Sequence, residues 1–462
     1  VHVFGTNPKI TKLLHINPFR FPEEIHVLEH IDRLIEIFSV CWPMYAAMPA
    51  VLKNAMLQAY EVCGWNLETS ENEYNKNLFP TFQDLLTELV DVIEHSAYDK
   101  EVKNNYRGSL ETRVRSLANG LNGQIFSADE IPEKQLFDEN TIVDLSRVGS
   151  LESKSLIMGI LIMRLNEYRM TSCTEMNNPL KHVTVLEEAH NILRRTSMEQ
   201  TEEGSNVAGK SVEMIANAIA EMRTYGEGFV IADQSPGAVD ISAIRNTNTK
   251  IIMRLPDEQD RQLAGKAAAL KDDQLDEIAR LPKGVAVIYQ NNWTEPVLCK
   301  INKFEGEEKR YQYKTCATDR KAEMMSAILL RNLLKKEKGE PLDLNLRQLQ
   351  DLLLKVSMPS KTKIAALKAL QKNGRCRQKD IQSVVYKLVC TPKVEEELTH
   401  TESIEEWRDE IAYFGSTGLA DLDEEMLNEV AELILLEQIK RYDWPKTYLE
   451  QWQEFRKKEM LV

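Results

Sequence analysis

The chain has 462 residues, a formal net charge of −14, 28 % charged residues and 43 % hydrophobic residues. At roughly 150 residues per domain, this length predicts about three domains with buried cores, and the many apolar residues exclude a mainly disordered chain. The low counts of 19 Gly and 16 Pro exclude collagen-like and low-complexity classes. The acidic balance argues against coating of DNA by bulk charge, but it allows a local basic surface.

Cysteine usage and the apolar runs predict a cytoplasmic protein without membrane association. The seven cysteines form no Cys-x-x-Cys pair, which disfavours a disulfide framework or a zinc site and favours a reducing compartment. The longest apolar run, at 155–163, is far shorter than the roughly 20 residues of a membrane helix. The first residues have the pattern of a strand and no Met precedes them, so we expect the later part of a longer protein.

Short apolar runs predict strands, most of them continuously apolar as in strands that are covered on both faces. They lie at 1–4, 141–146, 182–188, 228–234, 249–255, 285–290 and 296–302. Helical patterns occupy 151–170, which is apolar all round, and 209–226, which ends at Gly226 as at a helix C-cap. The alternation predicts an α/β fold with a mostly parallel sheet.

Two regions break this alternation. Amphipathic helical segments at 28–135 predict a helical insertion without clear strands, and helices after about residue 316 predict a separate C-terminal domain. The expected organisation is therefore the start of the core at 1–27, the insertion at 28–135, the main core at 136–315 and the helical domain at 316–462.

An apolar strand at 183–186 leads directly into two carboxylates, Glu187 and Glu188. In P-loop NTPases the first acid of such a pair holds Mg²⁺, and the second polarises the water that attacks the γ-phosphate. The alternative is a strand that runs into an acidic helix start, where Glu is favoured by the helix dipole. On this motif alone, the two interpretations have about equal weight.

A second predicted strand, at 228–234, carries Asp233 and Gln234 at its carboxyl end. An amide at that position can contact both a γ-phosphate and the attacking water, although Gln-Ser-Pro-Gly is also good turn chemistry. Arg223, just before the strand, can reach a phosphate in its own subunit or across an interface. A solvated cation at a helix end is its simpler interpretation.

These segments resemble the HerA/FtsK superfamily, above all the HerA-like ATPases, which are similar to the ATPases of conjugative secretion. The resemblance spans about residues 1–302, and its motifs are INPFRFP (16–22), VTVLEEAHN (183–191), AEMRTYGEGFVIADQSP (220–236) and IRNTNTKIIMRLPDEQDRQLAG (244–265). It implies a RecA-like core, a homo-hexameric ring, and ATP-driven movement of double-stranded DNA. Such ATPases serve a nuclease or another effector in DNA processing or phage defence.

Carried over residue by residue, the resemblance makes Glu187 the Walker B acid that holds Mg²⁺ and Glu188 the catalytic glutamate. It makes Gln234 the polar sensor and Arg223 the sensor or finger arginine, with ATP as the nucleotide. We expect the family's phosphate-binding loop to precede Val1, so this sequence does not contain it. Two rival functions remain: a secretion or conjugation motor, and a ring scaffold that does not hydrolyse ATP.

A substitute phosphate loop is present at 204–211, which matches G-x-x-x-x-G-K-[ST] and makes Gly209, Lys210 and Ser211 candidate nucleotide ligands. A polar segment precedes it instead of a strand, and it follows the acid pair, so a loop with a helix start is favoured. Arg245, before the strand at 249–255, is a further candidate for nucleotide or interface contact.

Three weaker candidates have local explanations. His190 can orient Glu188, but local packing or capping is favoured, and Asp144 is either a supporting residue near the site or a turn residue. The basic stretch at 360–380 can contact DNA, although a lysine-rich helix face is usually only solvated.

Overall fold

The computed structural model describes residues 1–45, 47–173, 175, 177–195, 207–306, 311–313, 321–390, 392–399, 401, 403–415, 422–442 and 447–459. The chain forms two compact units, each built from several stretches of sequence. Unit 1 comprises Val1–Leu14, Phe21–Asn54 and Pro132–Tyr313, and unit 2 comprises His15–Arg20, Ala55–Ile131 and Lys314–Val462.

Unit 1 contains a strand at each predicted apolar run and one further short strand, at 12–13, that the sequence pattern did not predict. They are β1 (His2–Gly5), β2 (Lys12–Leu13), β5 (Thr141–Asp144), β6 (His182–Glu187), β7 (Glu227–Ala232), β8 (Thr249–Ile252), β9 (Val285–Gln290) and β10 (Val297–Lys300). β1 pairs in parallel with β2 and β5, and β6 pairs in parallel with β7. β8, β9 and β10 form an antiparallel sheet. The expected α/β class is confirmed, with parallel pairing in the part that carries the acid pair.

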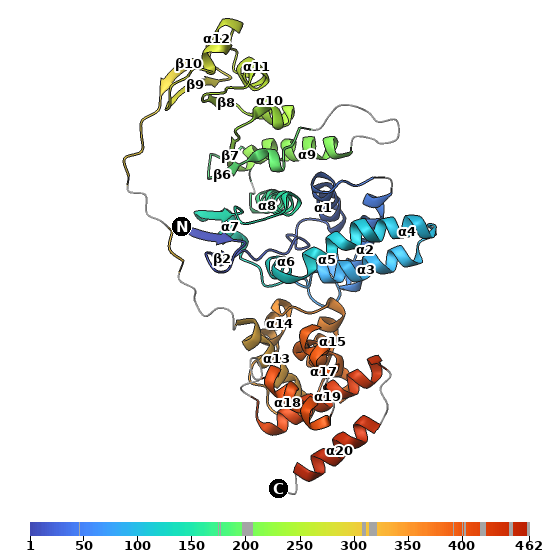
Figure 1. The fold of residues 1–462 in the computed structure, drawn as a ribbon. Helices are drawn as coiled ribbons and strands as arrows, with labels where there is room; N and C mark the ends of the chain where they lie inside the picture. The colour runs from blue at the N-terminus through green and yellow to red at the C-terminus, as the bar shows by residue number, and fades with distance from the viewer. Residues whose placement is uncertain are drawn as a thin grey trace. The chain divides into compact units, whose positions relative to one another are not determined.

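The helices of unit 1 include the two that the sequence predicts between the strands. They are α1 (Val27–Cys41), the first part of α2 (Met48–Val62), α7 (Glu133–Phe137), α8 (Leu151–Ser172), α9 (Val207–Glu221), α10 (Ile241–Asn246), α11 (Glu258–Ala267) and α12 (Asp272–Ile278). α1 lies beside α8 and α9 (Figure 1).

A buried ion pair fixes α1 against α8. His30 Nδ1 lies 2.9 Å from Glu167 Oε1, and both side chains are fully buried. Burial acts to raise the pKa of Glu167, but the charges of His30, Arg164 and Arg33 outweigh it and hold that pKa below its ordinary value. The start of the expected insertion therefore packs with the core strands and helices of unit 1.

The expectation that the apolar strands are covered on both faces is wrong for this chain. Val185, Val230 and Ile251 keep 58 %, 49 % and 61 % of their surfaces exposed. On the other face of the β6–β7 pair, the buried carboxylate of Glu227 accepts from Arg169 of α8 at 2.8 Å. Unit 1 therefore buries one face of this pair and leaves apolar side chains of the other face in solvent.

Unit 2 is mostly helical. Its elements are the rest of α2, β3 (Trp65–Asn66), β4 (Glu71–Asn72), α3 (Phe82–His95), α4 (Lys100–Tyr106), a π-helical turn (Arg107–Glu111), α5 (Thr112–Ala118), α6 (Gly120–Ile125), α13 (Lys321–Lys338), α14 (Leu346–Lys355), α15 (Ser360–Gln371), α16 (Gln378–Val389), α17 (Pro392–Thr399), α18 (Ile404–Gly415), α19 (Glu424–Tyr442) and α20 (Thr447–Glu459). The short β3–β4 pair is a feature that the sequence pattern did not predict.

Residues of the expected insertion share a core with the C-terminal helices. The buried core of unit 2 combines Leu78 with side chains from α13 to α20. Asp84 of α3 accepts from the backbone N–H and the hydroxyl of Ser360 at 2.7 and 2.9 Å. Within the basic stretch, Lys363 is buried and Lys361 contacts Glu88 at 3.1 Å, so part of that stretch has a structural role.

The described cysteines are free, and several are deeply buried. Burial raises the pKa of the Cys41, Cys63 and Cys390 thiols, which keeps them protonated and poorly nucleophilic at neutral pH. Across the ranges that the structure describes, no helix combines the length and the apolarity needed to cross a membrane.

Candidate functional site

β6 and β7 carry the predicted acidic and amide side chains to one edge of their sheet. The strands are parallel and in register along their whole length, with Glu187 opposite Ala232. Glu188 directly follows β6, and Asp233 and Gln234 directly follow β7. Because open α/β sheets bind ligands at the carboxyl ends of their strands, this edge is the candidate site.

Glu188 has a left-handed backbone conformation, with φ 53° and ψ 49°. Such a conformation costs a residue other than glycine about 1–2 kcal/mol. Two hydrogen bonds from Asn191 to the Glu188 carbonyl oxygen stabilise it, one from the backbone N–H at 3.0 Å and one from the side-chain amide at 2.7 Å. Gln234 Nε2 donates to Glu188 Oε1 at 3.2 Å. The predicted acid and the predicted sensor are therefore in contact.

Asp233 closes the turn that follows β6. Its Oδ2 accepts from the backbone N–H of His190 at 2.9 Å and lies 2.8 Å from His190 Nδ1, and its Oδ1 accepts from the N–H of Ser235 at 3.0 Å. Burial acts to raise the pKa of Asp233, but these hydrogen bonds outweigh it and hold that pKa below its ordinary value. Asp233 is therefore a charged acceptor that joins the two strand ends.

Glu187 has an exposed side chain at the last position of β6. Mg²⁺ is usually held by one or two carboxylates together with water and substrate phosphate, and an exposed carboxylate at a strand end fits that pattern. Within the described ranges, no group of three or more His, Cys, Asp or Glu side chains is arranged to hold a metal ion. Water and a bound phosphate would therefore have to complete the coordination of a magnesium ion at Glu187.

Arg223 lies at the opposite end of β7. It belongs to a 3₁₀ turn, Met222–Tyr225, which precedes the strand and ends at Gly226 with φ 84°, as the sequence predicts for a C-cap. The six residues of β7 separate this turn from Gln234, and at about 3.3 Å per residue they span about 20 Å. Within one chain, Arg223 and Glu188 are therefore at different ends of the same sheet.

Only the last residues of the substitute phosphate-loop motif, from 207 onward, lie within the described residues. Gly209, Lys210 and Ser211 lie in the first turns of α9, and residues 196–206 are outside the described residues. Ser211 is fully buried, and its hydroxyl donates to Glu36 of α1. The side chain of Lys210 is exposed. The motif thus supplies one accessible cation and one hydroxyl that already has a partner within unit 1.

The segments after β6 and β7 are joined beyond the acid pair. Arg194 forms an antiparallel bridge with Val239, and the N–H of Asp240 donates to the carbonyl of Leu193 at 2.8 Å. Asp240 caps α10, and Arg245 is exposed in the last turn of that helix. The segment from Asp240 to Arg245 is therefore attached to the chain that follows the acid pair.

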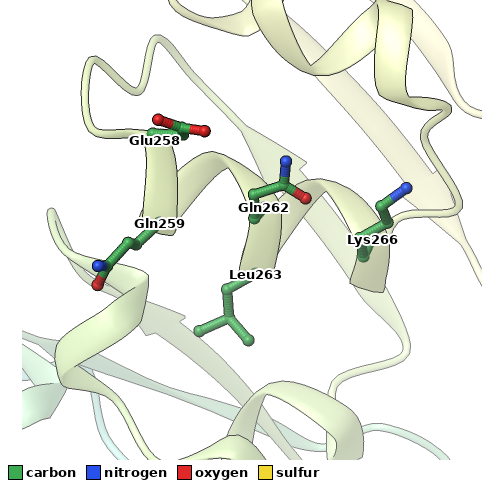
Figure 2. Close-up of a pocket in the computed structure, with 5 residues that line it drawn as sticks. All are labelled: Glu258, Gln259, Gln262, Leu263 and Lys266. Atoms are coloured by element: carbon green, nitrogen blue, oxygen red, sulfur yellow. The ribbon is translucent and has the colours of Figure 1, made fainter.

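A surface hollow of unit 1 lies elsewhere, on α11. Figure 2 shows the side chains that line it, all from this helix: Glu258, Gln259, Gln262, Leu263 and Lys266. Ligand pockets usually place polar groups from several elements around one point, and a hollow on a single helix lacks that arrangement. The strand-end cluster is therefore the better candidate site.

Sequence reasoning missed one contact at the candidate site and left another residue undecided. It favoured local packing or capping for His190, whereas the structure joins His190 to Asp233 on the neighbouring strand. The available signal was an acid at the end of each of two parallel strands with a histidine two residues after Glu188. Asp144 is the last residue of β5, and hydrogen bonds from the side chain and backbone of Ser146, in the turn that follows, hold its pKa below the ordinary value.

The sequence comparisons point in one direction. No family model matches the chain. The chain is 23 % identical over 301 residues to the DNA double-strand break repair helicase HerA of Sulfurisphaera tokodaii. The aligned residues cover 62 % of this chain and 58 % of that protein. HerA of Sulfolobus acidocaldarius is 26 % identical over 170 residues, or 36 % of this chain and 32 % of that protein. The chain is a relative of the HerA helicases.

The HerA relationship rests on these sequence matches. Among solved structures, VirB4 of Thermoanaerobacter pseudethanolicus has a TM-score of 0.48 and 14 % identity, covering 66 % of this chain and 76 % of that one. A TM-score below 0.5 adds no argument. The chain spans little more than half of the length of the Sulfurisphaera HerA. The activity, substrate and partners of this HerA relative are therefore proposed below.

Proposed function

We propose that this chain supplies the catalytic acids and the sensor of an ATPase that moves double-stranded DNA. The observation that carries the proposal is the 3.2 Å hydrogen bond between Gln234 and Glu188 across the ends of two parallel strands. It pairs a carboxylate that can accept a proton with an amide that can contact phosphate or water. Similarity to DNA double-strand break repair helicases supports DNA as the substrate that is moved.

In this proposal each polar side chain at the strand ends has its own task. Glu188 accepts a proton from the water that attacks the γ-phosphate of ATP, and Gln234 orients Glu188 and contacts the phosphate. Glu187 holds Mg²⁺ through its exposed carboxylate. When bound, the ion neutralises charge that develops on the phosphate oxygens.

Arg223 is proposed to act on the neighbouring subunit. Because it lies at the amino end of β7, about 20 Å of strand separates it from Gln234 of the same chain. In a homo-hexameric ring, Arg223 of one copy can face the acid pair of the next copy. Lys210 and Arg245, exposed on the neighbouring helices α9 and α10, are proposed as further cations toward phosphate. A nuclease or another effector in DNA processing or phage defence is the proposed partner.

The test is DNA-stimulated ATP hydrolysis by the natural full-length protein and its Glu188→Gln variant. Removing a positioned general base lowers the rate by about 10²- to 10⁴-fold, whereas Glu213→Gln, on an exposed position of α9, leaves it unchanged. Equal hydrolysis by the wild type and Glu188→Gln would refute the catalytic assignment. A wild type that binds ATP without hydrolysing it would favour the ring scaffold instead.

A further inference from the structure

His190 stands between two carboxylates that come from different strands. Its ring Nδ1 lies 2.8 Å from Asp233 Oδ2 and 3.7 Å from Glu188 Oε2. The side chain of Asp233 is 6 % exposed, whereas those of Glu188 and His190 are 40 % and 36 % exposed. The histidine therefore links a nearly buried acid to the acid that faces solvent.

The hydrogen bonds to Asp233 fix which nitrogen of His190 carries a proton. Both carboxylate oxygens already accept from backbone N–H groups, those of His190 and Ser235. A carboxylate whose pKa is held low only accepts hydrogen bonds, so the ring must donate from Nδ1. This donation fixes the plane of the imidazole and attaches the turn after β6 to the end of β7.

We propose that Asp233 and His190 are a positioning pair that keeps the Glu188 carboxylate within reach of Gln234. The inference rests on the proposed ATP hydrolysis, and both residues act through Glu188. The contact spans 43 positions of sequence, so it joins two strands and is more than a cap within one turn. Without it, the left-handed conformation of Glu188 relies on the two hydrogen bonds from Asn191, and the carboxylate is held less firmly toward the reacting water.

The first experiment separates positioning from folding through matched variants. Asp233→Ala removes the acceptor of the His190 ring, and His190→Ala removes the ring itself. We expect both to lower kcat for ATP about 10- to 100-fold, with KM within about twofold of the wild type. His190→Asn keeps a donor near the Nδ1 position and is expected to restore kcat to within about threefold. His95→Ala, 78 % exposed in unit 2, is the neutral control.

The second experiment does not depend on hydrolysis. Nitrogen NMR of ¹⁵N-histidine-labelled protein reports the tautomer of each of the eight histidines, and His190→Asn identifies the resonance of His190. We expect the Nδ1–H tautomer in the wild type and its loss in Asp233→Ala, which removes the acceptor of the ring. An Nε2–H tautomer in the wild type overturns the inference, as does wild-type kcat in a folded His190→Ala. A wild type without ATPase activity refutes the proposed function together with this inference, whereas hydrolysis that His190→Ala leaves intact refutes only the inference.

Discussion

Lys363 of α15 is fully buried. We expect its titration to make the free energy of unfolding of unit 2 change with pH in the alkaline range. Its Nζ donates to the carbonyl of Leu354 at 2.7 Å. Burial lowers the pKa of Lys363 to about 8 from the ordinary 10.5, in spite of the opposing charge of Asp84. The change Lys363→Met keeps the length of the side chain and removes the titrating group.

The sign follows from which state binds more protons. Between about pH 8 and 10.5, the unfolded chain keeps the Lys363 proton while the folded chain loses it, so the free energy of unfolding rises with pH. At about 1.4 kcal/mol per unit of pKa, the 2.5-unit difference between 10.5 and about 8 corresponds to about 3 kcal/mol. Below pH 8 the cost of burying the charge is fully present, and it is relieved as the pH approaches 10.5.

The assay is urea unfolding of the wild type and Lys363→Met at steps between pH 7 and pH 10.5, followed by tryptophan fluorescence. Taking the difference between the two proteins removes the titration of other groups, including Cys63, whose raised pKa acts with the opposite sign. Across this range, we expect the free energy of unfolding of the wild type to rise by about 3 kcal/mol relative to that of the variant. Lys379→Met, at an exposed position of α16, serves as the control with a flat difference. A flat difference for Lys363→Met as well would refute the reasoning.

Three further predictions concern unit 1. Mixed rings of inactive Arg223→Ala and inactive Glu188→Gln subunits should regain about a quarter of wild-type ATPase activity, because about one interface in four then has both groups intact; no recovery on mixing contradicts action between subunits. Ser211→Ala should lower stability by about 1 kcal/mol in thermal unfolding, through loss of its bond to α1, and leave the KM for ATP unchanged; a large rise in KM would instead make it part of a phosphate loop. Arg169→Met should lower stability by about 3 kcal/mol, since it removes the arginine from the buried carboxylate of Glu227 and leaves it the contacts of His182 and Thr184; denaturant unfolding that matches the wild type would contradict this.

The sequence by itself determined the longer strands, the two central helices and the residues at the ends of β6 and β7, but not the short strands β2, β3 and β4. Continuous apolar runs bounded by polar residues gave the ends of β6 to within one residue and those of β7 to within two, because the order of apolar and polar residues is a local property of the sequence. The order strand, Glu187, Glu188 and strand, Asp233, Gln234 then placed the site at carboxyl ends. A parallel arrangement brings such ends together wherever the two strands are neighbours.

Tertiary structure alone decided which distant residues touch. The turn after β6 is attached to the end of β7 by the Asp233–His190 contact, which joins positions 43 apart. The burial of Lys363 likewise depends on helices far apart in sequence. Residues 28–135 divide between two units because α1 packs against α8 in unit 1, whereas α3 bonds to Ser360 in unit 2. Local patterns carry no information about these contacts, since their free energy comes from burial and hydrogen bonding that exist only after the chain has folded.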